Sequence, residues 1–496
     1  MAVLYFICNI LKVRIEMSST LRTKIARATP FEGAPKINMP KIIGASPKKP
    51  VLIRLAVSGK RPIEYSALSL PKGLVLEENI ISGTVELEGE YEITVVAKNT
   101  LGKCKKKITL EIKDQNVLVT PLLGYTTWNA FASKITQADV EAVANRIVDL
   151  GIAEYGYGYV NTDSGWQGEY GGEFDAVMPN KKFPDMKGMT DKIHALGLKC
   201  GIYSTPMLTA WGCPEELESI PGCTRGAPDH RFATTNGGIG VERAEKNNAL
   251  QWDAWGFDYL KYDWAPTDPV NADLMREELV KLSRDFGFCV TVCAIKEYSN
   301  YWSKYCNSYR SNPDTFCNWG NLVEIYETYF KFMEHVCKGH YFDLDMLDFG
   351  TCKLHTLWHA LTDDEKVMEY SMRAFLNSPI QISSTLENVT DFELSVYCNE
   401  EIIAINQDCA FSTAVPVVRV KEGDRYFDVL EKELEDGAYA YAFFNMGSEP
   451  ENVSTVANGS LRDLWAKEDV EHTGNFEITV LPHTARIIKS LSKLNF

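Results

Sequence analysis

The sequence predicts a multidomain protein in which a (β/α)8 barrel, or TIM barrel, lies between two β-sandwiches. Strand-like and helix-like runs alternate eight times over about 290 residues in the middle of the chain. Before and after that stretch the helical patterns stop, and short β-like runs are separated by turns. The 496 residues are enough for three or four domains of roughly 100–200 residues each.

The first predicted domain is a small β module at residues 36–115, after an N-terminal extension at 1–35. Apolar residues alternate with polar ones around Ile53, Ile93 and Ile108, and turns containing Gly or Pro separate these runs. Short strands at this spacing are typical of an immunoglobulin-like sandwich, although the Cys…Trp…Cys signature of antibody domains is absent. We expect this module to have a packing or spacer role rather than to bind sugar.

The second predicted domain, residues 116–408, carries the barrel. A helix is expected from Thr136 to Gly151, because apolar residues recur there on one face, and others over 272–286 and 363–376. A doubly wound open sheet also alternates strands and helices, so the alternation alone leaves that fold open. The eight strand-like runs are 122–125, 157–161, 199–203, 259–262, 289–293, 307–310, 342–346 and 380–383.

The third predicted domain, residues 409–496, is an antiparallel β-sandwich whose expected role is structural. Its β-like runs are 417–420, 439–444, 476–480 and 485–488, with Gly, Pro and Asn between them.

The charge balance argues against two classes of partner. Lys and Arg number 51 and Asp and Glu number 67, so the net charge is −16. Such a surface repels phosphate backbones and anionic lipid, and no apolar run reaches the roughly 18 residues that span a bilayer. We therefore expect no nucleic acid and no membrane partner. The sequence leaves open whether the chain forms a homo-oligomer.

The cysteines and the N-terminus favour a cytoplasmic protein. None of the 13 cysteines forms a C-x-x-C pair, and the first apolar residues lack the preceding positive charge of a secretory signal. Met17 is a candidate alternative start. Cys213, Cys223 and His230 share one loop-like stretch and could bind a metal, but we expect no metal site.

Two clusters of charged residues lie where a barrel places its active site, at the C-terminal ends of the strands. Lys261 and Asp263 end the fourth run and point to the same side, since side chains alternate along a strand. Arg310 and Asp314 follow the sixth run, and Asp345 is expected within the seventh. Two carboxylates at the mouth of a barrel fit glycoside hydrolysis, in which one attacks the sugar and the other protonates the leaving oxygen.

A series of motifs resembles the melibiase-type α-galactosidases, glycoside hydrolase family 27 of clan D. They are LGYTTWNAF at 123–131, YVNTDSGW at 159–166, GIY at 201–203, YLKYD at 259–263, DML at 345–347, NQD at 406–408 and DLW at 463–465. The resemblance covers the chain from residue 121 to its end. It implies a (β/α)8 barrel followed by an antiparallel β domain, and cleavage of oligosaccharides or other glycosides with retention of configuration and without cofactors.

The resemblance also implies roles for individual residues. Asp263 matches the family nucleophile and Asp314 the general acid/base, which in a retaining enzyme stand about 5–5.5 Å apart. Trp128 matches the aromatic floor of the sugar pocket, and Trp264 is added because it adjoins the nucleophile. The other implied sugar contacts are Asp163, Tyr203, Lys261 and Arg310.

Three positions depart from the family pattern. Ser164, Ala294 and Thr385 stand where many members carry carboxylates, and such exchanges redirect specificity while the chemistry is kept. Ala294 could admit a bulky 2-substituent. The sugar therefore stays open between galactose and the substrates of an α-N-acetylgalactosaminidase, a β-L-arabinopyranosidase or an α-glucoside-acting enzyme. From other classes, a non-catalytic carbohydrate-binding protein and a metal-dependent hydrolase also remain as alternatives.

Overall fold

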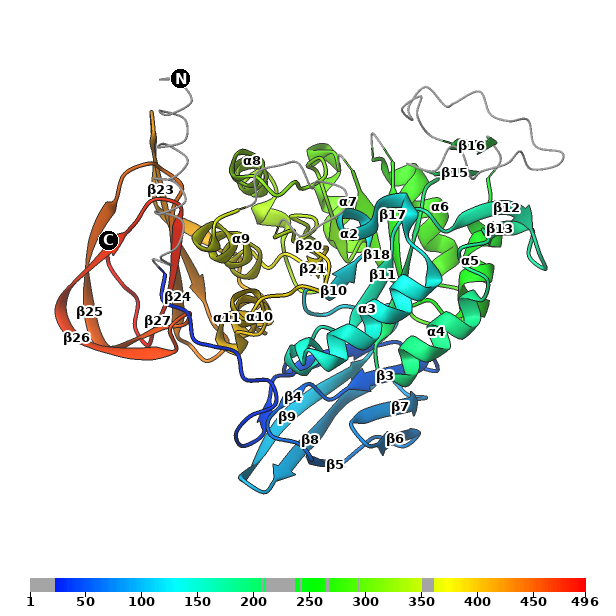
Figure 1. Cartoon of the computed structure of the whole chain (residues 1–496), viewed down its shortest axis with the longest axis horizontal. Coiled ribbons are helices and arrows are strands. Elements are labelled where there is room, and N and C mark those ends of the chain that lie inside the picture. Colours follow the sequence, from blue (N-terminus) through cyan, green and yellow to red (C-terminus); the bar gives the residue numbers. More distant parts are fainter. Residues whose placement is uncertain are drawn as a thin grey trace, which may run out of the picture.

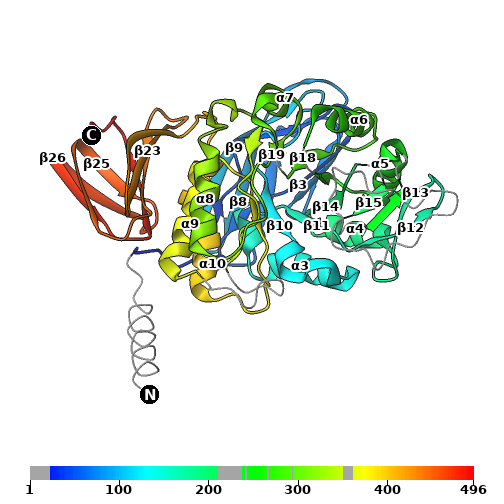
Figure 2. The same cartoon turned by 90° about the horizontal axis from the view of Figure 1, so that it is seen from above.

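The computed structural model describes residues 23–206, 208–210, 237–240, 243–264, 267–292, 294–349 and 361–496. A central barrel has one β domain at one end and a second β domain at its side (Figures 1 and 2). These are the three parts that the sequence predicts, in the predicted order. The boundaries at residues 35, 115 and 408 stay predictions.

The N-terminal domain is a β-sandwich. Its two main sheets have the strand orders β2-β9-β8-β5 and β3-β7-β6, and β1 pairs with β4. Ile53 and Ile81 of one sheet and Ile93 and Leu110 of the other belong to one buried core, which the predicted alternation supplies. The strands are β1 (Lys36–Ile37), β2 (Ile42–Ala45), β3 (Pro50–Arg54), β4 (Val57–Ser58), β5 (Glu64–Leu68), β6 (Leu74–Glu77), β7 (Ile80–Thr84), β8 (Gly89–Asn99) and β9 (Gly102–Ile112).

The barrel is a parallel eight-stranded sheet with the order β20-β19-β18-β17-β14-β11-β10-β21. Leu347 closes it, because this residue forms a parallel bridge with Ile382 of β21. The closed sheet decides between the two alternatives that the sequence left open. The strands are β10 (Leu123–Thr126), β11 (Tyr159–Thr162), β14 (Lys199–Ser204), β17 (Tyr259–Asp263), β18 (Gly287–Thr291), β19 (Ser308–Tyr309), β20 (Tyr341–Phe342) and β21 (Ile380–Ile382). The structure also has two two-stranded antiparallel sheets, β12 (Gln167–Gly171) with β13 (Ala176–Pro179) and β15 (Leu208–Ala210) with β16 (Gly237–Gly240).

The fifth and seventh strands differ from their predicted ranges. β18 begins at Gly287, two residues before the predicted run, and Cys293 at the end of that run lies outside the described residues. β20 ends at Phe342, so the expectation that Asp345 lies within the seventh strand is wrong. Asp345 has a positive φ of 68°, which a strand does not accommodate, and Arg373 binds the neighbouring backbone carbonyls.

A side-chain cap stands at the start of each of the three helices that the sequence predicts. The expected helix after β10 is α3 (Gln137–Asp149), with Thr136 and Asp139 forming a capping box. The helix expected over 272–286 is α6 (Pro269–Leu279), because Asp268 caps its N-terminus and Pro269 occupies the first turn. The others are α2 (Trp128–Phe131), α4 (Met186–Ala195), α5 (Glu245–Trp255), α7 (Ser299–Tyr305), α8 (Trp319–Tyr329), α9 (Asp363–Phe375), α10 (Asp391–Tyr397) and α11 (Glu400–Asn406).

The C-terminal domain is a six-stranded antiparallel sheet with the order β22-β23-β24-β27-β25-β26. It packs one face on its own core, including Val429 and Phe443, and contributes Leu430 and Phe444 to the core of the barrel. The sequence did not predict β23 or β25. In β23 the charged residues Asp428, Glu431 and Lys432 are buried, so the apolar alternation typical of a strand is missing from its sequence. Their burial is possible because each of them is hydrogen-bonded. The strands are β22 (Val415–Glu422), β23 (Arg425–Glu433), β24 (Tyr439–Asn445), β25 (Glu451–Asp463), β26 (Glu468–Val480) and β27 (Thr484–Ser490).

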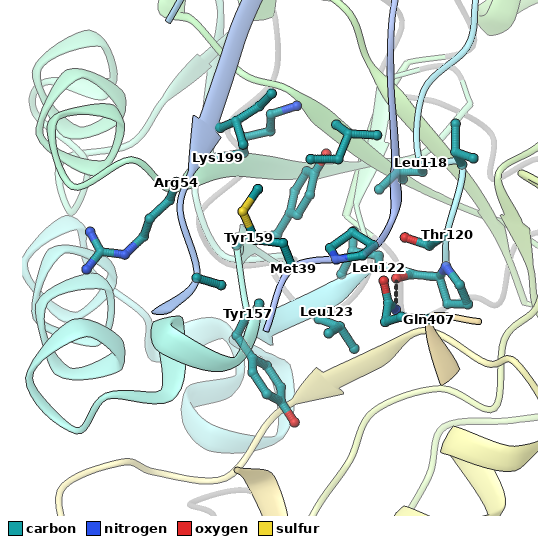
Figure 3. A pocket seen from close by; sticks show the side chains of 18 of the residues that line it. Met39, Arg54, Leu118, Thr120, Leu122, Leu123, Tyr157, Tyr159, Lys199 and Gln407 are labelled. Carbon is teal, nitrogen blue, oxygen red and sulfur yellow. Dashed lines mark hydrogen bonds between the residues drawn. The ribbon is translucent and has the colours of Figure 1, made fainter. Parts of the chain in front are cut away.

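The N-terminal domain covers the end of the barrel where the strands begin. A cavity of about 160 Å³ remains between them, lined by Met39 of the N-terminal domain, by Leu118 and Leu122 of the connecting segment, and by Tyr157 and Tyr159 of the barrel (Figure 3). The labelled side chains in this view are mostly apolar. This end of the barrel therefore serves as a packing surface.

A buried ion-pair cluster fastens the two domains beside this cavity. Glu154, in the short helix η2 (Ile152–Tyr155), lies 2.8 Å from Arg54 and 2.8 Å from Arg61 of the N-terminal domain. Its other oxygen accepts a hydrogen bond of 3.3 Å from the Val57 N–H. The Glu154 side chain is 1% exposed, so its charge is balanced by the N-terminal domain rather than by water.

The described cysteines are free thiols, namely Cys104, Cys200, Cys289, Cys306, Cys317, Cys337, Cys398 and Cys409. A search of the described residues for a helix with the length and apolar character of a bilayer span finds none. The cytoplasmic location stays a prediction.

Candidate active site

The C-terminal ends of the barrel strands bring the predicted charged residues together. Lys261 and Asp263 alternate along β17 with Tyr262 and Trp264, whose rings pack edge to face with centroids 5.0 Å apart. Because side chains alternate, the two aromatic residues take the opposite face of the strand from the two charged residues. One short strand thus supplies both core packing and site chemistry.

The two carboxylate oxygens of Asp263 differ in their hydrogen bonding. Tyr203 of β14 donates a hydrogen bond of 2.8 Å from its hydroxyl to Asp263 Oδ2. Asp263 Oδ1 is buried and has no hydrogen-bond partner among the residues that the structure describes. Burial raises the pKa of Asp263 to about 6, the positive charges of Lys261 and Arg310 oppose this rise, and the Asp314 charge adds to it. An oriented carboxylate with an uncommitted oxygen is suited to act as a nucleophile.

Asp163 and Lys261 form a buried ion pair next to Asp263. The Lys261 ammonium lies 2.7 Å from Asp163 Oδ2, and the Ser164 N–H donates to Asp163 Oδ1 at 2.7 Å. Burial alone would lower the pKa of Lys261, but the Asp163 carboxylate outweighs it and raises the pKa. Lys261 therefore stays positively charged and favours the ionised form of the neighbouring carboxylates.

Arg310, just beyond β19, connects two more carboxylates. Its NH1 atom lies 2.9 Å from Asp314 Oδ1 and 2.6 Å from Asp345 Oδ2. Arg310 and Asp345 are 2% and 5% exposed, whereas the Asp314 side chain is 37% exposed. Asp314 is therefore the member of this group that solvent reaches.

The Asp263 and Asp314 carboxylates lie within electrostatic reach of one another, since the charge of Asp314 raises the pKa of Asp263. Both also act on Arg310, whose pKa they help to raise against the effect of burial. The separation of about 5–5.5 Å that a retaining mechanism requires stays a prediction.

The remaining predicted contacts are less closely tied to this cluster. Trp128 begins α2 directly after β10 and is partly exposed, and Thr385 follows β21 and is also partly exposed. Ala294 is 2% exposed and donates its N–H to the Arg310 carbonyl, so it offers little surface to the mouth. Trp264 donates its indole N–H to Asp268 at the start of α6. Sugar contacts by these four residues stay predictions.

Sequence reasoning missed Thr291, Asn129 and Thr315, which hold the cluster in place. Thr291, the last residue of β18, accepts a hydrogen bond from Arg310 Nε. Asn129 donates to the Thr315 carbonyl at 2.9 Å, and Asp345 accepts from the Thr315 N–H at 2.7 Å. Thr291 and Asn129 are polar residues at or just beyond strand ends, and that position was the available signal for both.

The metal-ligand candidates Cys213, Cys223 and His230 lie outside the described residues. Within the part of the chain that the structure does describe, no group of three His, Cys, Asp or Glu side chains could hold a metal ion.

Two family models match the chain. Residues 228–408 match a melibiase model described as alpha galactosidase A, which covers the second half of the barrel. Residues 424–490 match the model of the alpha galactosidase C-terminal beta sandwich domain.

Individual proteins are similar over most of the chain. Alpha-galactosidase A of Cellvibrio japonicus is 28% identical over 349 residues, which are 67% of this chain and 78% of that protein. Alpha-galactosidase 3 of Arabidopsis thaliana is 27% identical over 381 residues, 73% of this chain and 80% of that protein. A Bacteroides fragilis crystal structure assigned as an alpha-galactosidase/melibiase superposes with a TM-score of 0.81 and 27% identity, covering 94% of this chain and 99% of that chain.

Proposed function

The chain belongs to the melibiase-type α-galactosidase family of glycoside hydrolases, and we propose that it is a retaining exo-α-glycosidase that removes a terminal galactose-like sugar. The observation that carries this proposal is the state of Asp263. One of its oxygens is held by Tyr203, the other is buried and uncommitted, and the Asp314 charge acts on it. Double displacement needs an ionised carboxylate nucleophile with a second carboxyl group beside it, so this state of Asp263 supports the proposal.

In the first step, Asp263 Oδ1 attacks the anomeric carbon and forms a covalent glycosyl-enzyme ester. The bond between that carbon and the glycosidic oxygen breaks, and Asp314, as a carboxylic acid, gives its proton to the departing oxygen. In the second step, the Asp314 carboxylate takes a proton from water, whose oxygen attacks the anomeric carbon and releases Asp263. The two inversions at one carbon give overall retention.

The surroundings of the two carboxylates support this division of labour. Lys261 and Arg310 lower the pKa of Asp263 against the effect of burial, which favours the ionised form that a nucleophile needs. The Asp314 side chain is 37% exposed, so the departing alcohol can leave it and the attacking water, from which it regains its proton, can reach it. An acid/base residue must change its protonation state twice per turnover, whereas the nucleophile does not.

Asp163 and Lys261 are proposed to bind hydroxyl groups of the sugar. They lie next to the nucleophile, and an ionised carboxylate and an ammonium together can accept from and donate to vicinal hydroxyls. Ser164 and Thr385 replace expected carboxylates by hydroxyls, which changes two partners of the sugar and leaves Asp263 and Asp314 unaltered.

A panel of aryl glycosides tests the proposal. We expect release of 4-nitrophenol from the α-galactoside, an α-configured sugar as the first product by NMR, and labelling of Asp263 by a fluorinated substrate that traps the ester. Faster release from the α-N-acetylgalactosaminide, β-L-arabinopyranoside or α-glucoside would identify that glycoside as the preferred substrate and leave the proposed mechanism unchanged. Sugar binding without release from any glycoside would support a non-catalytic carbohydrate-binding protein instead.

A further inference from the structure

We propose that Asp345 is a positioning residue for proton transfer: it fixes the backbone that carries Asp314 and shares the Arg310 guanidinium with it. This inference rests on the proposed function, in which Asp314 is the general acid/base. Asp345 contacts the same Arg310 NH1 atom as Asp314 and is 5% exposed.

The backbone after Asp314 is held from both sides. Asp345 Oδ2 accepts the Thr315 N–H at 2.7 Å, and Asn129 Nδ2 donates to the Thr315 carbonyl at 2.9 Å. Because Thr315 directly follows Asp314, the bond from Asp345 holds the 314–315 peptide that adjoins the Asp314 side chain, and the bond from Asn129 holds the next peptide, 315–316. A proton donor has to lie within hydrogen-bond reach of the oxygen that it protonates, so an error of about 1 Å here is costly.

Asp345 also moderates the charge next to Asp314. The same Arg310 NH1 atom contacts Asp345 at 2.6 Å and Asp314 at 2.9 Å. An arginine that paired with Asp314 alone would favour its carboxylate form and so hinder its work as an acid. A second carboxylate on that guanidinium cancels part of this attraction.

Asp345 is charged, as this role requires. Burial would raise its pKa, but Arg310 and Lys261 outweigh burial and lower it. The other titratable groups that act on Arg310 are Asp263 of β17 and Asp343 beyond β20, and burial together with Asp345 raises the pKa of Asp343 to about 6.

A support beneath Asp345 holds it in its unusual conformation. Asp345 has a positive φ of 68°, and its N–H donates to Asp343 Oδ1 at 2.7 Å. Arg373, which is 0% exposed, donates to the carbonyls of Leu344 at 3.2 Å and Met346 at 2.7 Å. Its own partner is Glu369 at 3.0 Å. Non-glycine residues are rarely held at such a φ unless their surroundings fix them.

The first test is the pH profile of kcat/KM for Asp345→Asn. Asparagine keeps an oxygen for the Thr315 N–H but removes the charge, so Asp314 becomes the one carboxylate in an ion pair with Arg310 among the described residues. We expect the basic limb of the profile to move to lower pH by about one unit, while the acid limb moves less. An unmoved basic limb, or one that moves to higher pH, would overturn the inference.

Glu369→Gln is the matched control. It alters the support under residues 344–346 without changing the charges around Arg310, and burial already raises the pKa of Glu369 to about 7. We expect a lower melting temperature and an unmoved basic limb. The same shift in both variants would show that loosened packing, rather than the charge of Asp345, sets the limb.

A second test uses the leaving group. Asp345→Ala removes the anchor of Thr315, and we expect kcat/KM to fall about 10²-fold for a galactoside with a sugar leaving group, which needs an acid. For a 2,4-dinitrophenyl galactoside, which leaves without a proton, the loss should be severalfold at most. Equal losses on both substrates would overturn the inference. A wild-type enzyme that cleaves neither substrate would instead overturn the proposed function.

Discussion

The two ends of the barrel each contain a buried carboxylate, and they treat it in opposite ways. Glu154, at the end covered by the N-terminal domain, has two arginines at 2.8 Å and a backbone N–H as partners. Asp263, at the other end, has one tyrosine hydroxyl and an oxygen without a partner among the described residues. Both carboxylates are buried, so it is the completeness of pairing that separates the structural Glu154 from the proposed nucleophile Asp263.

The surroundings of the two carboxylates differ in the same sense. Near Glu154 the barrel presents apolar side chains to the N-terminal domain, such as Leu122 and Leu123 (Figure 3). Near Asp263, by contrast, Lys261, Arg310 and Asp314 gather within electrostatic reach. The same replacement of acid by amide should therefore have different effects at the two ends.

The largest expected effect is on activity at the reactive end. Asp263→Asn removes the nucleophile, and we expect kcat to fall about 10⁴-fold or more on every substrate that the wild type cleaves. Steady-state rates with an aryl glycoside measure this. A variant that retains a tenth of the wild-type rate would show that another residue is the nucleophile.

The second effect is on stability at the structural end. Glu154→Gln leaves Arg54 and Arg61 without a counter-charge at the domain boundary, and we expect a loss of about 3 kcal/mol in the free energy of unfolding. Urea-induced unfolding measures the loss. Activity of the folded variant should equal that of the wild type, because distant sites act independently. A large fall in kcat with unchanged stability would contradict the comparison.

The third expected effect is a gain in folding stability, in contrast to the loss expected for Glu154→Gln. Because the pKa of Asp263 is raised to about 6, its ionisation destabilises the folded protein, and this cost builds up as the pH rises from about 4 to 6. Asp263→Asn should therefore stabilise the protein by about 1–3 kcal/mol at neutral pH. Melting temperatures of the variant and the wild type should converge below about pH 4. A variant that is less stable at pH 7 would rule out this cost.

The smallest effect is the acid limb of the wild-type pH profile. Asp263 must be ionised to attack, so kcat/KM should fall about tenfold per pH unit below a pKa of about 6. Tyr203→Phe removes a hydrogen bond that lowers this pKa, and the limb should move to higher pH by less than one unit. A limb that stays in place in Tyr203→Phe would assign it to another group.

The sequence was sufficient for the fold and for the strand ends at which Asp263 and Asp314 lie, since alternation and strand ends are local patterns, while the roles of these two residues stay predictions. It placed Asp345 inside a strand, because a positive φ imposed by Arg373, a residue of a distant helix, leaves no local signal. It also missed Glu154, whose partners lie about 100 residues away in another domain. Contacts of this kind depend on how the elements meet and cannot be read from spacing.

The unequal strands of the barrel have a consequence for turnover. Asp263 ends a strand that pairs along its length with both neighbours, whereas Arg310 and Asp314 follow β19, which forms two residue pairs on each side. Strand pairing therefore holds the nucleophile side of the barrel at more residue pairs than the acid/base side. The position of Asp314 depends instead on the side-chain bonds that Asp345 and Asn129 make to Thr315, so those two residues do for the proton donor what the strand ladder does for Asp263.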